Sequence, residues 1–93
     1  MSTFDTYIPD AEIFARVVNP EQGDLPPEMA EMVLNLDFQP SDRKTMQILS
    51  EKASQGELTE SEREMLDGFI RVGHFLGMLK SKARVSLKNK PNA

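Results

Sequence analysis

The sequence contains no cysteine and only one histidine and one tyrosine among its 93 residues. Without cysteine the chain can form neither a disulfide framework nor a thiolate metal site. One histidine excludes a histidine-rich metal site within a single chain. No run reaches the roughly 18 apolar residues that span a bilayer, and the N-terminus has neither region of a signal peptide. We therefore expect a cytoplasmic protein with no cofactor, no metal and no membrane partner.

Hydrophobic residues make up 39% of the chain and charged residues 28%, which is typical of a folded soluble domain. A chain of this length forms one small domain and buries only about two-thirds of its unfolded surface. The net charge of −4 conceals a partition: residues 1–67 carry −10, whereas residues 68–93 carry six bases and no acid. Such an asymmetry indicates nucleic acid, an acidic partner or self-complementary assembly.

Proline, asparagine and glycine divide the chain into four helical segments, and no segment reads as a strand. The first helix lies within 9–20, the second within 26–38 and the third within about 41–55, while a long fourth helix covers about 60–89. The sequence thus predicts an all-α fold, with an arm at 1–8, a single helical domain at 9–90 and a tail at 91–93. The second helix has one apolar face, made by Leu25, Met29, Met32, Val33 and Leu36.

Local signals set the expected ends of the third and fourth helices. Ser41 is a good N-cap for the third helix, and Gly56 suits the left-handed residue that follows it. Thr59 and Glu62 form a T-x-x-E capping box at the start of the long helix. Because only about three residues join the third helix to the fourth, we expect these two helices to form an antiparallel αα-hairpin.

The long helix carries apolar residues at alternating spacings of four and three, the a/d seam of a coiled coil. The seam consists of Met65, Phe69, Val72, Leu76, Leu79 and Ala83. Gly73 and Gly77 lie beside it, one turn apart, although an interior glycine costs up to about 1 kcal/mol relative to alanine. Two explanations stay open: the glycines accommodate Phe14 or Phe38 of the same chain, or they admit a helix of another chain.

No catalytic constellation is present, and we expect a protein that is not an enzyme. His74 lies in the apolar helix without candidate partners, and the sequence has no phosphate-binding loop or nucleophile elbow. The basic end of the helix is the best functional candidate. Its bases can meet solvent, an acidic protein surface or nucleic-acid phosphates, and they are Lys80, Lys82, Arg84, Lys88 and Lys90.

Residues 36–87 resemble a family of small, largely uncharacterised bacterial proteins. The shared pattern is G-x-L-T-x-x-E-R, here 56–63, followed by S-K-A-R, here 81–84. Some members are similar to proteins encoded beside HNH-type nuclease genes, which implies an antitoxin-like or accessory role. The resemblance supplies no catalytic residues.

These observations predict a helical protein–protein interaction module, antitoxin-like or a small scaffold subunit, that forms a homodimer through its long helix. In an antiparallel pair, each acidic helix start would face the partner's basic end. A protein partner with an acidic or apolar surface is possible, and the alternative is a small dimeric nucleic-acid-binding protein. The expected interaction residues are Met65, Phe69, Val72, Gly73, Leu76, Gly77, Leu79, Lys80, Lys82, Arg84 and Lys88.

Overall fold

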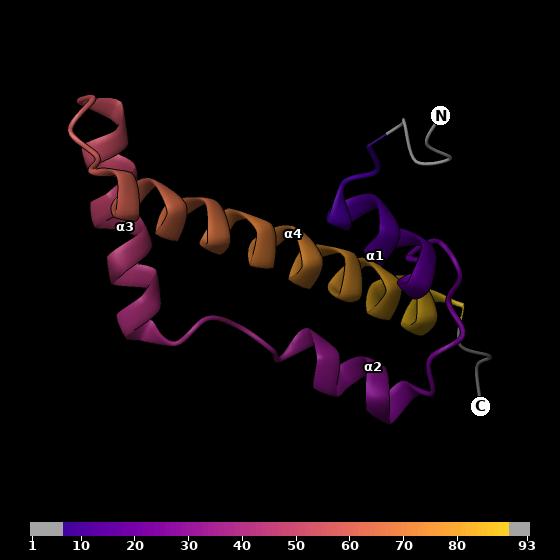
Figure 1. Ribbon diagram of the computed structural model, residues 1–93. Coiled ribbons are helices and arrows are strands. Elements are labelled where there is room, and N and C mark those ends of the chain that lie inside the picture. Colours follow the sequence, from indigo (N-terminus) through magenta and orange to yellow (C-terminus); the bar gives the residue numbers. More distant parts are fainter. Residues whose placement is uncertain (1–6, 90–93) are drawn as a thin grey trace, which may run out of the picture.

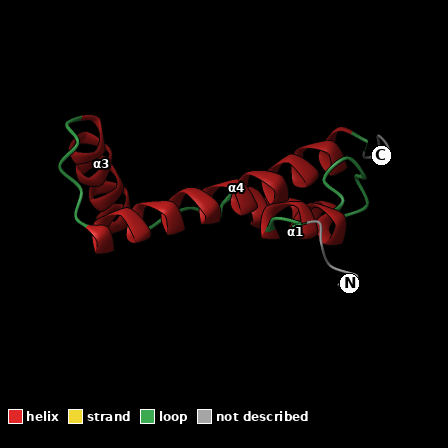
Figure 2. Cartoon of the chain, turned by 45° about the horizontal axis from the view of Figure 1, so that its top comes forward, coloured by secondary structure: helices red, strands yellow, loops and turns green. Residues whose placement is uncertain are grey.

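The computed structural model describes residues 7–89, and this part of the chain consists of four helices and their loops (Figures 1 and 2). The helices are α1 (Asp10–Val18), α2 (Pro27–Leu34), α3 (Pro40–Ser54) and α4 (Glu60–Lys88). The predicted all-α class and the long C-terminal helix are confirmed. Most of the expected arm, Lys90 and the expected tail lie outside the described residues.

Helix α4 is the axis on which the other three helices pack. Within residues 7–89, the backbones of α1, α2 and α3 each approach that of α4 closely, whereas the backbones of these three helices do not approach one another. Figure 1 shows α1 and α2 on different sides of the C-terminal half of α4, while α3 crosses its first turns. Packing is therefore concentrated near the two ends of α4.

The molecule is thin and extended. Its radius of gyration is 17.1 Å, against about 12 Å for a compact domain of this length. Its principal extents are 54 × 47 × 16 Å, so one dimension is about a third of the other two. A flat, extended arrangement of this kind buries little of each helix.

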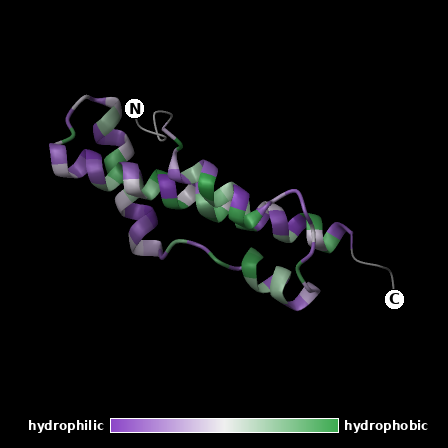
Figure 3. Cartoon of the chain, turned by 45° about the vertical axis from the view of Figure 1, so that its right-hand side comes forward, coloured by the Kyte–Doolittle hydropathy of each residue, from purple (hydrophilic) through white to green (hydrophobic). Residues whose placement is uncertain are grey.

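The core is correspondingly small. The buried apolar residues are Ala30, Leu49 and Ala83, and no large side chain in the described range is fully buried. Figure 3 shows hydrophobic residues along α2 and along the middle of α4, where other helices cover them only in part. Stable domains normally bury apolar faces between two layers, so this chain leaves unusual apolar area in solvent.

The helix ends follow the local signals with one correction. Thr59 Oγ1 accepts a hydrogen bond from the Glu62 amide at 3.1 Å, and Glu62 Oε1 accepts one from the Thr59 amide at 2.9 Å, which confirms the capping box. Gly56 has a φ of 69° and ends α3 as expected. The predicted N-cap at Ser41 is wrong: α3 begins at Pro40, because proline suits the first helical position.

The antiparallel hairpin expected from the short connection is not confirmed. In Figures 1 and 2, α3 stands across the beginning of α4 and does not run along it. Leu49 is the buried anchor of α3, at 4% exposure, whereas the neighbouring Ile48 is 49% exposed. Most of the length of α4 is therefore left to α1, α2 and solvent.

Candidate functional site

The first half of the seam on α4 is an open apolar surface. Met65 and Val72 are each about half exposed, at 49% and 51%. Phe69 is half-buried and meets the ring of Phe38 edge-on, with centroids 6.1 Å apart. These residues line an open hollow of about 440 Å³ beside α3. The chain's own helices do not fill it.

A second hollow of about 240 Å³ continues along the seam. Val72, Leu76 and Leu79 line it together with Phe38 and Phe75. The two hollows share Phe38 and Val72. Five of the six seam residues thus line one apolar strip on α4, and the sixth, Ala83, is fully buried within the chain. The seam therefore has an open part, from Met65 to Leu79, and a last residue, Ala83, that belongs to the core of the chain.

The helical glycines have little internal packing to explain them. A Cβ atom at Gly73 would lie 3.9 Å from the ring of Phe38, an ordinary contact, and at Gly68 and Gly77 it would meet nothing within 4 Å. Phe14, the other expected occupant, stacks on Phe75 with centroids 4.6 Å apart. Accommodation of large side chains of this chain therefore does not account for Gly77.

The acidic start of α4 is held in place by a contact with α3. Lys52 Nζ lies 2.5 Å from Glu62 Oε2, which couples the end of α3 to the first turn of α4. The hydrogen bond from Lys52 lowers the pKa of Glu62, and the backbone amide of Thr59 adds to the effect. The other acids here are exposed and have no ion-pair partner within residues 7–89; they are Glu57, Glu60, Glu64 and Asp67.

The basic end of α4 does not act as one exposed patch. Arg84 and Lys88 are exposed, one turn apart, and Lys80 is half-buried. Lys82, expected among the outward-facing bases, is only 9% exposed. The expectation of an exposed contact at Lys82 is therefore corrected: its position on α4 faces the loop between α1 and α2.

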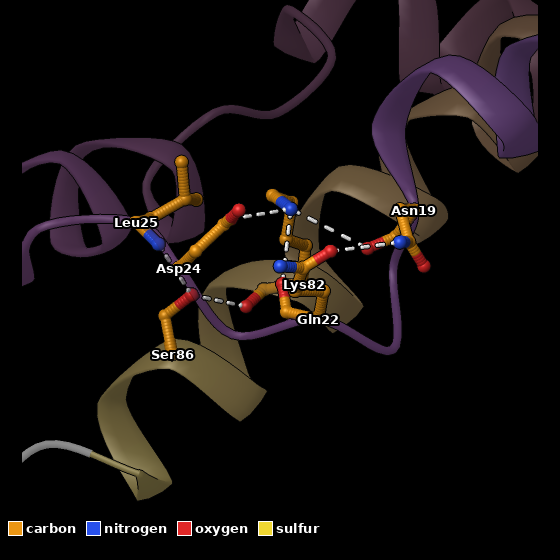
Figure 4. A network of polar contacts seen from close by, with 6 residues as sticks. All are labelled: Asn19, Gln22, Asp24, Leu25, Lys82 and Ser86. Carbon is orange, nitrogen blue, oxygen red and sulfur yellow. Dashed lines mark hydrogen bonds and ion pairs between the residues drawn. The ribbon is translucent and has the colours of Figure 1, made fainter.

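Lys82 organises that loop through three contacts (Figure 4). Its ammonium lies 2.6 Å from Asp24 Oδ1 and donates to the carbonyl oxygens of Gln22 at 2.9 Å and Asn19 at 3.4 Å. The hydrogen bond from Lys82 lowers the pKa of Asp24. A lysine so deeply enclosed needs these acceptors, because an unpaired buried ammonium is very costly.

Ser86 and Gly23 complete the attachment. Ser86 Oγ donates to the carbonyl of Lys82 at 2.8 Å and accepts from the amide of Leu25 at 3.1 Å (Figure 4). Gly23 lies so close to α4 that a Cβ atom would be 2.7 Å from the carbonyl carbon of Val85. Lys82 and Ser86 thus clamp residues 19–25 and thereby place α1 and α2. The sequence analysis did not predict this clamp. The one feature of the sequence that indicates it is Gly23, since a glycine allows the loop to approach α4 closely.

The apolar face that the sequence predicts for α2 is largely open to solvent. Met29, Met32 and Leu36 are 50%, 71% and 49% exposed, whereas Ala30, on another side of the helix, is completely buried. The chain's own helices therefore leave these three residues of the apolar face uncovered. A small alanine was overlooked because its apolar surface is modest, yet it allows close packing.

Comparisons with protein-family models, with curated proteins and with solved structures find no match for this chain. The resemblance noted for residues 36–87 remains a prediction. Within residues 7–89, no helix is both long and apolar enough to cross a membrane.

Proposed function

We propose that the protein is a non-enzymatic helical interaction module of the cytoplasm that associates with a second copy of itself through the open seam of α4. The observation that carries this proposal is the uncovered strip lined by Met65, Phe69, Val72, Leu76 and Leu79. An antitoxin-like or scaffold role agrees with it, since such proteins act by presenting helical faces to partners.

The amount of exposed surface supports association. Met65 and Val72 of the seam keep 49% and 51% of their surface in solvent. Exposed apolar residues that gather in one strip are typical of interaction sites. A second layer over the α4 seam would cover apolar side chains that are now in solvent.

Charge supports an antiparallel arrangement of the two α4 helices. Three acids at the start of α4, Glu60, Glu64 and Asp67, have no ion-pair partner among residues 7–89, and neither do the bases Arg84 and Lys88 at its end. In an antiparallel pair these opposite charges come together, which favours this orientation over the parallel one. Exposed pairs of this kind are screened by salt, so association should weaken as ionic strength rises.

The experiment compares Val72→Glu with Val17→Glu by light scattering over a range of concentrations. Val72 lines both hollows of the seam, whereas Val17 is 78% exposed on α1. We expect a dimer for the unaltered chain and for Val17→Glu, and a monomer for Val72→Glu, because the new carboxylate would be desolvated in the interface. A monomeric unaltered chain, or a Val72→Glu variant that still dimerises, would reject the proposal.

Nucleic-acid binding is the weaker alternative. Lys82 is engaged with the loop, so the described end of α4 offers mainly Arg84 and Lys88 to phosphates. Titration of a labelled DNA duplex at low and moderate salt tests this alternative: binding that falls steeply with salt would favour it.

A further inference from the structure

Helix α2 carries a second uncovered apolar surface that is separate from the α4 seam. Its side chains surround an open hollow of about 400 Å³ whose lining is almost wholly apolar. Met29, Met32 and Leu36 form its exposed ridge, and Pro26, Glu28 and Val33 complete the lining. We call this surface the α2 hollow. It shares no residue with the two hollows of the seam.

The side of α2 that carries the hollow is not the side that packs on the rest of the chain. Ala30 is fully buried where α2 contacts α4, whereas Met32 keeps 71% of its surface in solvent. Exposed methionines form adaptable apolar surfaces, because the side chain is unbranched and the thioether is polarizable. A row of them at helical spacing suits an apolar partner of variable shape.

The surroundings of the α2 hollow are acidic. Residues 17–42 contain six acids and no lysine or arginine. Asp24 and Asp37 are bonded to Lys82 and Arg43, but Glu28 on the rim and Glu31 three residues further on have no ion-pair partner within residues 7–89. The uncompensated negative charge favours a partner with positive charge beside its apolar face.

We propose that the α2 hollow docks an amphipathic helix of another protein, with an apolar face bordered by lysine or arginine. The eight residues of α2 span about 12 Å at 1.5 Å per helical residue, which matches about two turns of a docked helix. Methionine side chains would adapt to its apolar face, while Glu28 on the rim would set its register. This site acts independently of self-association through α4.

The test uses the full chain with ¹³C-methyl-labelled methionine and a synthetic 18-residue leucine–lysine amphipathic peptide. Met29 and Met32 report on the α2 hollow, and Met65 reports on the α4 seam. We expect the peptide to shift the methyl signals of Met29 and Met32 and to leave Met65 unchanged. A peptide with the same leucines and with glutamate in place of lysine should bind at least about tenfold more weakly.

Two variants and one control locate the contact. Met32→Glu should weaken peptide binding at least about tenfold, because it places a charge in the apolar contact, and Glu28→Lys should weaken it several-fold by reversing the rim charge. Val17→Glu, an exposed change outside the hollow, should leave the affinity unaltered. Circular dichroism of each variant confirms that the helices are retained.

Three results with the peptides would overturn the proposal: no binding at millimolar peptide, a shift of Met65 without Met29 and Met32, or equal affinity for the acidic peptide. Dilution of the unaltered chain separates this site from the proposed dimer. If dilution shifts Met29 and Met32, a second copy covers the hollow and the proposal is also rejected. If it shifts Met65 alone, self-association is at the seam and the peptide result decides on the α2 hollow.

Discussion

Replacing Lys82 with methionine should destabilise the protein, although Lys82 belongs to a run of bases that reads as a solvated helix end. The ammonium donates to the Gln22 carbonyl at 2.9 Å from a residue that is 9% exposed. Hydrogen bonds from charged donors contribute about 1.5–3 kcal/mol. Methionine retains most of the apolar stem, so the loss is mainly polar, and we expect about 2 kcal/mol in the free energy of unfolding.

The assay is urea unfolding of Lys82→Met and of Lys88→Met, followed by circular dichroism at a concentration where the chain is monomeric. With a slope of about 1–2 kcal/mol per molar urea, the midpoint of Lys82→Met should fall by about 1–2 M. Lys88 is exposed on the same helix, so its variant should remain within about 0.5 kcal/mol of the unaltered chain. Equal midpoints for the two variants would refute the clamp.

Two further predictions concern the same loop and the start of α4. Gly23→Ala should destabilise the protein by about 1–3 kcal/mol, since its Cβ would lie 2.7 Å from the backbone of Val85. A Cβ at Gly77 would meet nothing within 4 Å, so Gly77→Ala should stabilise the monomer by up to about 1 kcal/mol. Thermal unfolding that ranks the two variants in the opposite order would contradict this packing. Lys52 lowers the pKa of Glu62 below its unfolded value, so this carboxylate stabilises the fold above about pH 4.3 and the contribution is lost as the pH falls through the folded-state pKa. Glu62→Gln should therefore flatten the acid limb of the stability–pH curve, and an unchanged limb would count against the Lys52 contact.

Much of the local structure could be predicted because it depends on neighbouring residues. The capping box needs only Thr59 and Glu62 three residues apart, and Gly56 ends α3 because glycine readily adopts a positive φ. The length of α4 likewise follows from a continuous helical pattern. The N-cap of α3 was misplaced by two residues, at Ser41 and not at Gln39, because serine and proline are both favourable near a helix N-terminus.

The candidate surfaces were predictable only in part. The seam on α4 follows from the spacing of Met65, Phe69 and Val72, and the structure leaves these residues half exposed or half-buried. The same reasoning gave the second helix one apolar face that includes Met29 and Met32, and the structure leaves both at least half exposed while it buries Ala30. Apolar periodicity identifies a face of a helix, but it does not state whether the chain has another element to cover it.

The sequence by itself determined four helices, the capping box of α4, the long seam and the separation of acidic from basic residues, because these depend on residues near one another along the chain. Only the tertiary structure decided which bases are free and which apolar faces stay in solvent. Lys82 and Asp24 lie 58 positions apart, and no local pattern brings them together. Their pairing needs the close approach at Gly23 and the bond from Ser86, which arise only once the loop lies on α4.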